Sequence, residues 1–382
     1  MIPLAKPSLS WYERRNVSKA VKSTWIGSKG FFIDKASEDF RQVCGADYVA
    51  LVSNGTTALH LALLSLNVED SDEVIIPNFT YVAVANAVRY CNAKPIFCNV
   101  DSKSWNLNPE EIRAKVSLKT KAIIVVNSYG RIADYSRIRA ILSEMHRNDI
   151  KIIEDASQSH FGSKNGFVSG TFGDIATFSF FANKVLTTGE GGAVCSNDKS
   201  LIDRVNFLKN QSLKSSNENY FDFPEIGYNY RMNNLAAALL CGQIKRSAKL
   251  LNARNEIYQS YRHELEKYEF YEFQTECQNE FISPWLFPVI LKVKDFQTRN
   301  LCIDFMKKNG VETRPFYKIL SMLPAFQKYN VEPNKSNTKL SALGINLPTY
   351  VDLRQKDIKI VCRNLNRFMQ DNITTNYVNL SN

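Results

Sequence analysis

Several residue patterns that would mark a metal, redox or secreted protein are missing from this chain. Only four histidines occur in 382 residues, and none is spaced with cysteines or carboxylates as metal ligands usually are. The eight cysteines form no CxxC pair and follow no regular spacing. We therefore expect no metal site, and we expect the cysteines to be reduced, mostly buried small side chains, as in the cytoplasm.

Long apolar runs and blocks of like charge are also missing. No run is long enough to span a bilayer, and the opening MIPLAKPSLSWYERR has no apolar stretch typical of a signal peptide. Lysine and arginine exceed aspartate and glutamate by 48 to 38, a net charge of +10, but the two signs are interspersed. That excess suits a polyanionic small ligand or merely a solvated surface, whereas a nucleic-acid site would need a basic stripe. We expect a cytoplasmic protein that binds neither a membrane nor nucleic acid.

Short β-rich runs alternate with helical patterns between residues 48 and 200. The runs are apolar and bounded by polar turns, which is typical of strands buried on both faces of a mostly parallel sheet. There are seven of them: YVALVS, EVIIP, KPIFCNV, KAIIVV, IKIIED, IATFSF and GGAVCS. Ligands of such α/β sheets lie at the carboxyl ends of the strands. Because Asn54, Pro77, Asp155 and Ser179 follow strand ends, we expect them to converge on one crevice.

The pattern changes after about residue 235. Longer amphipathic helical stretches begin with NLAAALLCGQIKRSAKLLNARNEIYQSYRHELEKY, and a strand-like run, WLFPVILKV, follows with another helix. No repeat or low-complexity linker separates the two parts. The sequence predicts a large domain over residues 1–245, whose N-terminal segment contributes to the substrate site, and a smaller C-terminal α/β domain over residues 246–382.

Lys184 is the strongest catalytic candidate. A lysine after a strand is usually a surface charge, but this one lies in FSFFANKVLTTGEGG, among aromatic and aliphatic residues and before a glycine-rich turn. Apolar neighbours lower the pKa of an amine and make it a better nucleophile. Asp155 closes a buried strand upstream, where an unpaired carboxylate is costly. Its simpler alternative is the capping of the next turn.

A reactive lysine and a buried carboxylate are the two groups that pyridoxal 5'-phosphate (PLP) requires. The amine binds the cofactor aldehyde covalently, and the carboxylate keeps the pyridine nitrogen protonated. Gln158 is a candidate partner of the phenolic oxygen of the cofactor, although glutamine is also an ordinary loop residue.

The cofactor phosphate needs an anchor, and VSNGTTALHLALLSL predicts one. It reads as strand, glycine turn and helix, so Gly55, Thr56 and Thr57 would present amides and hydroxyls at a helix N-terminus. Ser179 would add a hydroxyl from the strand before Lys184. Tyr81 follows another strand end and is a candidate to stack on the pyridine ring, or else a core aromatic.

Four segments, SNGTTALHLAL, EDASQSHFGS, GDIATFSFFANKVLTTGEGG and GYNYRMNNLAAAL, resemble the DegT/DnrJ-type sugar-nucleotide aminotransferases. The resemblance extends from IPLAKPSL to GINLPTY. It implies the aspartate aminotransferase fold (fold type I), PLP as cofactor, and transfer of an amino group from L-glutamate to a nucleotide-linked keto sugar. It also implies a homodimer with shared active sites, in which Asn229 reaches the cofactor phosphate of the neighbouring subunit and Arg231 adds positive charge near the substrate.

Within this family, STWIGSKG, DSKSWNLNP, GVETRPFY and GINLP are most similar to members that aminate carbon 4 of GDP-4-keto-6-deoxymannose, for O-antigen or related polysaccharides. The residues that the resemblance proposes as substrate contacts are Trp25, Ser28, Lys29, Arg314 and Tyr317; the alternative for each of them is a purely structural role. A dTDP- or UDP-linked 4-keto-6-deoxyglucose, or a 3-keto sugar, is the alternative substrate. A non-catalytic binding protein of the same fold is a distant alternative, disfavoured because Lys184 and Asp155 are both present.

One loop departs from the family pattern. Relatives usually carry His-Leu-Tyr-Gly-X-Pro-Ala, whereas this chain has Asn127 in place of the histidine and Ile132 in place of the proline. The two replacements affect the geometry of this loop, and neither of them changes a residue that is assigned to PLP.

Overall fold

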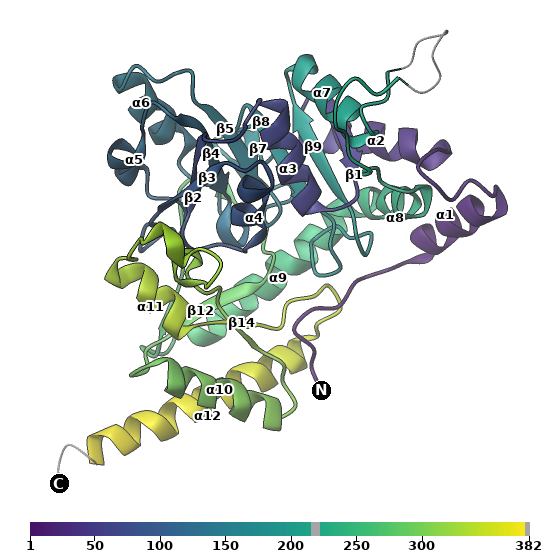
Figure 1. The fold of residues 1–382 in the computed structure, drawn as a ribbon. Coiled ribbons are helices and arrows are strands. Elements are labelled where there is room, and N and C mark those ends of the chain that lie inside the picture. Colours follow the sequence, from purple (N-terminus) through teal and green to yellow (C-terminus); the bar gives the residue numbers. More distant parts are fainter. Residues whose placement is uncertain (215–221, 379–382) are drawn as a thin grey trace.

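A computed structural model describes residues 1–214 and 222–378, the side chains of 373–378 excepted. Its main feature is a seven-stranded sheet in the order β1-β9-β8-β5-β4-β2-β3 (Figure 1). The strands are β1 (Tyr48–Val52), β2 (Glu73–Pro77), β3 (Lys94–Cys98), β4 (Thr120–Val126), β5 (Lys151–Asp155), β8 (Ile175–Ser179) and β9 (Gly192–Ser196). All seven predicted runs therefore form strands of one sheet.

Strands β3, β2, β4, β5 and β8 pair in parallel, and β9 runs antiparallel to both β8 and β1. The prediction of a mostly parallel sheet is confirmed. Because β9 reverses direction, the chain returns from the end of β8 through a loop of twelve residues, 180–191, rather than a crossover helix. That loop carries Lys184.

Helices cover both faces of this sheet. Helices α3 (Gly55–Ser65), α4 (Ala83–Tyr90) and α7 (Lys199–Lys209) pack on one face, and α2 (Phe31–Cys44), α5 (Pro109–Lys115), α6 (Tyr135–Glu144) and α8 (Asn234–Lys245) pack on the other. Neighbouring residues of a strand serve opposite faces, since Ile124 of β4 joins the first core and Ile123 the second. Both faces are therefore apolar, which explains the unbroken hydrophobic runs. Helix α1 (Trp11–Lys22) packs beside α8.

A second unit forms around a four-stranded antiparallel sheet in the order β10-β12-β14-β13. It consists of β10 (Tyr271–Glu272), β12 (Phe287–Leu291), β13 (Arg314–Pro315), β14 (Gly344–Leu347) and the helices α9 (Ser247–Leu265), α10 (Phe296–Lys308), α11 (Lys335–Leu343) and α12 (Gln355–Val378). We call this the small unit and the part around the seven-stranded sheet the large unit. The smaller C-terminal α/β unit is thus confirmed, while the boundary between residues 245 and 246 stays a prediction.

The first residues of the chain do not remain with the large unit. Ile2 forms a β-bridge with Val311, and the N–H of Ile2 donates to the carbonyl of Gly310 at 2.7 Å. Figure 1 shows the N-terminus beside the small unit, from which the chain runs to α1. The N-terminal segment therefore connects the two units and passes the space between them.

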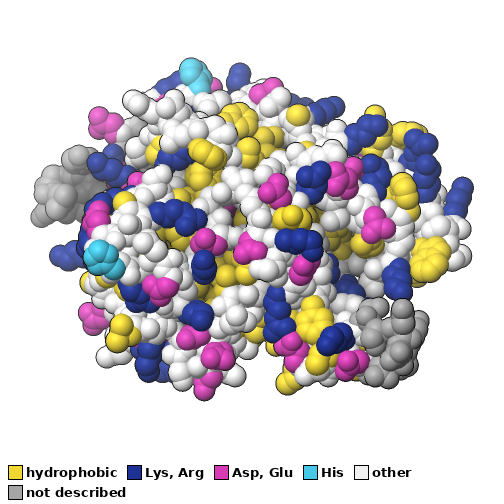
Figure 2. Space-filling view, turned by 90° about the horizontal axis from the view of Figure 1, so that it is seen from above, with side chains coloured by type: hydrophobic (Ala, Val, Ile, Leu, Met, Phe, Trp, Pro, Cys, Tyr) yellow, Lys and Arg dark blue, Asp and Glu magenta, His cyan; other side chains and the backbone are white. Residues whose placement is uncertain are grey.

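The remaining strands form a small three-stranded sheet. Strands β6 (Ser163–Lys164), β7 (Phe167–Val168) and β11 (Glu280–Phe281) pair antiparallel. A buried ion pair at 2.9 Å between Arg131 and Glu280 ties this sheet to the loop after β4. Basic and acidic side chains are interspersed over the face in Figure 2, as the sequence pattern indicates. Among the described residues, none of the helices combines the length and hydrophobicity needed to cross a membrane.

Candidate active site

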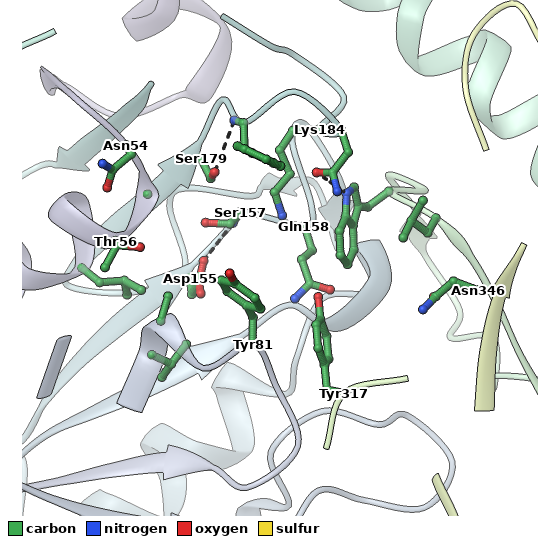
Figure 3. A pocket seen from close by; sticks show the side chains of 18 of the residues that line it. Asn54, Thr56, Tyr81, Asp155, Ser157, Gln158, Ser179, Lys184, Tyr317 and Asn346 are labelled. Carbon is green, nitrogen blue, oxygen red and sulfur yellow. Dashed lines mark hydrogen bonds between the residues drawn. The ribbon is translucent and has the colours of Figure 1, made fainter. Parts of the chain in front are cut away.

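A cavity of about 560 Å³ lies between the carboxyl ends of the large sheet and the small unit. Its walls come from the turns after β1, β2, β5 and β8 on one side and from the segments around β12, β13 and β14 on the other. The side chains in Figure 3 that line it include Asn54, Thr56, Tyr81, Asp155, Ser157, Gln158, Ser179, Lys184, Tyr317 and Asn346. The predicted convergence therefore occurs, with Tyr81 rather than Pro77 representing the β2 end.

The N-terminus of α3 forms one wall. Asn54 caps the helix by accepting the N–H of Thr57 at 2.9 Å, and the Thr57 hydroxyl accepts the N–H of Asn54 in return. Gly55 and Thr56 open the helix and line the cavity, where the amides of the first turn have no partner within the helix. A Cβ on Gly55 would lie 2.7 Å from the Cβ of Ser179, so only glycine allows this close approach of α3 to β8.

Asp155 is the last residue of β5, and its carboxylate faces the cavity. It is 5% exposed, and its Oδ1 accepts the backbone N–H of Ser157 at 3.0 Å. Burial raises the pKa of Asp155, while the bonds from Ser157 and the charge of Lys184 oppose the rise. A buried carboxylate in this state has a strong preference for a cationic partner.

Lys184 enters the cavity from the loop between β8 and β9. Its amine lies 4.0 Å from the centre of the Trp285 ring, and Figure 3 shows Lys184 and Tyr81 pointing into the cavity from opposite sides. Burial lowers the pKa of Lys184 to about 8; the charge of Arg254 acts in the same direction and Asp155 acts against it. The amine is therefore partly neutral near neutral pH, as a nucleophile or proton carrier must be.

The orientation of Gln158 follows from one hydrogen bond. Its Oε1 accepts the N–H of Tyr129 at 3.0 Å, and this bond shows which end of the side-chain amide is the oxygen. The NH2 group is therefore left as a donor toward the cavity. Tyr129 has a positive φ of 55°, in the loop that departs from the family pattern. Asn127 holds this loop, because its Nδ2 donates to Glu154 at 2.9 Å and its Oδ1 accepts the N–H of Ala133 at 3.1 Å. The side-chain amide of Asn127 thus holds the loop in place through buried hydrogen bonds.

The sequence-predicted residues separate into two groups. Gly55, Thr56, Tyr81, Asp155, Gln158, Ser179, Lys184, Arg314 and Tyr317 line the cavity. Thr57, Trp25, Ser28, Lys29, Asn229 and Arg231 do not. The hydroxyl of Thr57 serves the helix cap, and the Arg231 guanidinium donates to Asn210 and Asn229 at 2.8 and 2.9 Å. Trp25 is 58% exposed, on the N-terminal segment.

Sequence reasoning predicted only part of the wall that the small unit provides, namely Arg314 and Tyr317. Trp285 lines the cavity from a run predicted only as a strand, and Asn346 from the GINLP segment, of which no residue was assigned to the site. Asn183 directly precedes the lysine. The indole N–H of Trp285 donates to the Asn183 Oδ1 at 3.3 Å, so the tryptophan is attached to the lysine loop. An isolated tryptophan in WLFPVILKV gives no signal for this role, because the contact depends on how the two units pack.

The comparisons with known proteins identify the class. Residues 8–366 match the model of the DegT/DnrJ/EryC1/StrS aminotransferase family, and the chain belongs to this family. It is a PLP-dependent sugar aminotransferase with the fold type I architecture.

The chain is also similar to individual named proteins and solved structures. The chain is 37% identical to GDP-perosamine synthase of Escherichia coli O157:H7 over 97% of this chain and 99% of the relative. It is 36% identical to GDP-perosamine synthase of Vibrio cholerae over 95% and 97% of the two chains. In fold it is similar to a putative sugar aminotransferase of Streptococcus pneumoniae in its PMP form, with a TM-score of 0.93, 22% identity and coverage of 98% and 99%.

The residues of the cavity fit PLP. An open helix N-terminus suits a phosphate, the buried Asp155 carboxylate suits a protonated pyridine nitrogen, and the Lys184 amine faces the same space. The close approach of Gly55 to Ser179 brings a backbone amide and a hydroxyl to one corner, where a phosphate would find both as donors. The volume also suits a small cofactor with part of a substrate.

Proposed function

We propose that this enzyme transfers the amino group of L-glutamate to carbon 4 of GDP-4-keto-6-deoxymannose and so forms GDP-perosamine. The observation that carries the chemistry is the Lys184 amine facing the buried Asp155 across one cavity. The sugar assignment is supported by three relatives named GDP-perosamine synthase, 34–37% identical over at least 95% of this chain.

In this proposal five residues of one chain form polar contacts with the cofactor. Gly55, Thr56 and Ser179 bind the phosphate, Asp155 pairs with the pyridine nitrogen, and the Gln158 NH2 group donates to the phenolic oxygen. The ring of Tyr81 is available to stack on the pyridine ring. When bound, PLP supplies a ring that draws electrons from the carbon at which the amino group is exchanged.

Lys184 is the covalent anchor of the cofactor and then the proton carrier. Its Nζ removes the proton from the α-carbon of glutamate and later delivers a proton to carbon 4 of the sugar. Both tasks require that the amine change its protonation state near neutral pH, and a pKa of about 8 meets that requirement. Trp285 and Tyr317 stack with an interplanar angle of 11° and limit the access of water to the amine.

Arg314 and Tyr317 are the substrate contacts that we propose from this chain. Arg314 stands at the cavity, 62% exposed, and its guanidinium lies 3.2 Å from Glu312. An exposed arginine with one carboxylate neighbour retains donors for a diphosphate. The +10 charge of the chain favours the approach of such a polyanion.

We further propose a homodimer in which Asn229, Arg231 and the segment with Trp25, Ser28 and Lys29 act at the site of the neighbouring subunit. None of these residues lines the cavity of its own chain. Several apolar side chains near this segment are exposed, among them Phe31 at 70% and Trp25 at 58%, as expected of a surface that a second copy covers.

Complementation tests the shared site. Lys184→Ala and Asn229→Ala each inactivate a different part of the site, and after mixing and subunit exchange one site of every mixed dimer is intact. Random mixing should restore about a quarter of the wild-type rate, because half of the dimers are mixed. A mixture that remains inactive, although exchange is shown by mass, would contradict the shared site.

A titration tests the reaction and its substrate together. L-Glutamate is added to the PLP-loaded enzyme, and its absorption should change to that of the amine form of the cofactor. GDP-4-keto-6-deoxymannose should reverse the change, while dTDP- and UDP-linked 4-keto-6-deoxyglucose and a 3-keto sugar should not. Reversal by another sugar would replace the substrate, and no response to glutamate would exclude it as donor. A protein that never binds PLP would support the non-catalytic alternative.

We also propose a cytoplasmic location. All eight cysteines are free thiols and seven of them are buried. Such a set is expected in a reducing compartment, where disulfides do not persist.

A further inference from the structure

A buried arginine without an acidic partner lies directly behind the lysine loop. Arg254 of α9 is 2% exposed, and among the described residues no ion pair within 4.0 Å includes it. Burial is the sole cause that lowers the pKa of Arg254, to about 10, so no carboxylate compensates its charge. Because buried charges in proteins are normally paired, this arrangement is costly.

Backbone carbonyls take the place of a carboxylate. The Arg254 guanidinium donates to the carbonyl of Lys184 at 3.2 Å and to that of Asn183 at 3.4 Å. It also donates to the carbonyl of Trp285 at 2.5 Å and approaches that of Thr349 at 3.5 Å. One side chain thus joins the lysine loop of the large unit to two segments of the small unit.

The segments that Arg254 joins are the ones that set the surroundings of the reacting amine. Lys184 carries the amine, and the Trp285 ring lies 4.0 Å from it. The planar guanidinium can bind several carbonyls at fixed angles, which an ammonium group cannot. Losing it would remove these bonds and leave the hydrogen bond from the Trp285 indole to Asn183 to hold the two segments together.

We propose, building on the role assigned to Lys184, that Arg254 is a positioning residue. Its guanidinium holds Lys184 and Trp285 in one arrangement and keeps an unpaired positive charge beside the reacting amine. That charge favours the neutral, reactive form of the amine. An apolar residue would pack at lower cost, but it would provide neither the link nor the charge.

Other groups around the amine have to be considered in a pH experiment. Those that face it from the packed elements are Asp155 of β5, His160 after β5, Arg254 of α9 and Tyr317 after β13, with Glu190 and Arg314 on the cavity wall. Asp155 raises the pKa of Lys184 and Arg254 lowers it. His160 stays neutral, because burial lowers its pKa to about 3.

Arg254→Met tests the proposal in the full-length protein without cofactor. Trace acetylation at a series of pH values, followed by mass spectrometry of the peptide with residue 184, gives the pKa of the Lys184 amine. Loss of the charge should raise this pKa by about one pH unit. An unchanged pKa in the folded variant would overturn the proposal.

Arg299→Met is the matched control. Arg299 of α10 is also buried, at 7% exposure, and also donates to backbone carbonyls, those of Ser341 and Gly344, but it does not contact the lysine loop. It should leave the pKa of Lys184 unchanged, and a shift equal to that of Arg254→Met would overturn the proposal.

Arg254→Lys covers the case in which the methionine variant does not fold. The lysine ammonium can still donate hydrogen bonds, but it lacks the planar guanidinium that binds several carbonyls at once. The visible circular dichroism of the PLP-loaded enzyme reports the fixed orientation of the lysine-bound cofactor, and it should therefore weaken. A signal and a Lys184 pKa both equal to wild type would overturn the proposal. Borohydride reduction with peptide mapping separates this inference from the proposed function. Cofactor on another lysine would refute the role of Lys184 itself, whereas cofactor on Lys184 together with unchanged signals in the Arg254 variants would refute only the role of Arg254.

Discussion

The Trp285 ring of the small unit lies over the Lys184 amine of the large unit, with 4.0 Å between the amine and the ring centre. The ring has two opposing effects on the pKa of the amine. It excludes water, which favours the neutral form, and its face attracts a cation, which favours the charged form. The decrease of the pKa from 10.5 to about 8, which burial causes for the most part with a smaller contribution from the charge of Arg254, corresponds to about 3 kcal/mol, against about 2 kcal/mol for a cation–π contact of a desolvated amine. Exclusion of water therefore dominates.

Trp285→Ala should consequently raise the pKa of Lys184 toward 10.5, since water reaches the amine. Trp285→Phe retains an aromatic face and should shift the pKa less. Trace acetylation of the cofactor-free protein measures both variants. A pKa that falls in Trp285→Ala would mean that the cation–π contact, not the exclusion of water, dominates.

Asp155→Asn tests how the negative charge of Asp155 affects the Lys184 amine in the same cavity. The carboxylate raises the pKa of Lys184, so its removal should lower that pKa below about 8. Turnover should fall at least about a hundredfold, because the pyridine nitrogen would lose its charged partner. Asp198→Asn is the control: Asp198 caps α7 by accepting the N–H of Ser200 at 2.8 Å, and asparagine caps equally well. Normal turnover in Asp155→Asn would refute the role of Asp155.

The strands and the core of the site could be predicted because they depend on local sequence. The apolar runs define the seven strands, and parallel strands bring Asp155 and Ser179 to the same edge of the sheet. The antiparallel course of β9 could not be predicted, since an apolar run looks the same in either direction. Trp285, Arg254 and Asn346 were missed because their contacts arise only when the two units pack together.

The predicted residues that do not line the cavity illustrate another limit of prediction from the sequence. Thr57 follows Gly55 and Thr56 directly, but its hydroxyl is used in the cap with Asn54. A sequence motif does not distinguish a hydroxyl that binds a ligand from one that closes a helix. Asn229 and Trp25 were assigned by resemblance, and a single chain contains no partner surface against which to compare them.

Gly55→Ala tests the phosphate corner. The added Cβ would lie 2.7 Å from the Ser179 Cβ and 3.3 Å from the Ser179 Cα, so α3 would have to move from β8. We expect the affinity for PLP to fall by about tenfold or more, as overpacking of this kind costs about 1–3 kcal/mol. Gly310→Ala is the control, because a Cβ there also meets nothing within 4 Å and Gly310 lies outside the cavity, although its φ of 77° makes the alanine cost some stability. Equal PLP affinities of the two variants, measured by fluorescence titration, would contradict the assignment.

Arg314→Gln separates substrate binding from chemistry. If Arg314 binds the diphosphate, KM for the nucleotide sugar should rise about tenfold, while the reaction with glutamate stays unchanged. Arg354→Gln is a close match, since Arg354 is also exposed and paired with a nearby carboxylate, Asp357, at 2.8 Å, but lies outside the cavity. Steady-state kinetics of both half-reactions measures the effect. A loss of rate with glutamate alone would show that Arg314 acts on the amino donor.

His60→Phe tests how a buried histidine limits acid stability. His60 of α3 is 3% exposed and packs edge-on against Tyr90 and Tyr228, and burial lowers its pKa to about 4. Below pH 6.5 the unfolded chain binds a proton at this position that the folded chain does not bind until about pH 4. Stability is therefore fully present above pH 6.5 and decreases as the pH falls. At pH 5 this effect amounts to about 2 kcal/mol.

Phenylalanine keeps the ring contacts and removes the titration, so the urea midpoint of His60→Phe should fall less between pH 7.5 and pH 5 than that of the wild type. His160, whose pKa is also lowered, to about 3, acts with the same sign and accounts for part of the decrease that remains. If the two proteins lose stability in parallel, the His60 side chain must already be protonated in the folded state at pH 5, and its ring would have to be hydrated rather than enclosed by the tyrosines.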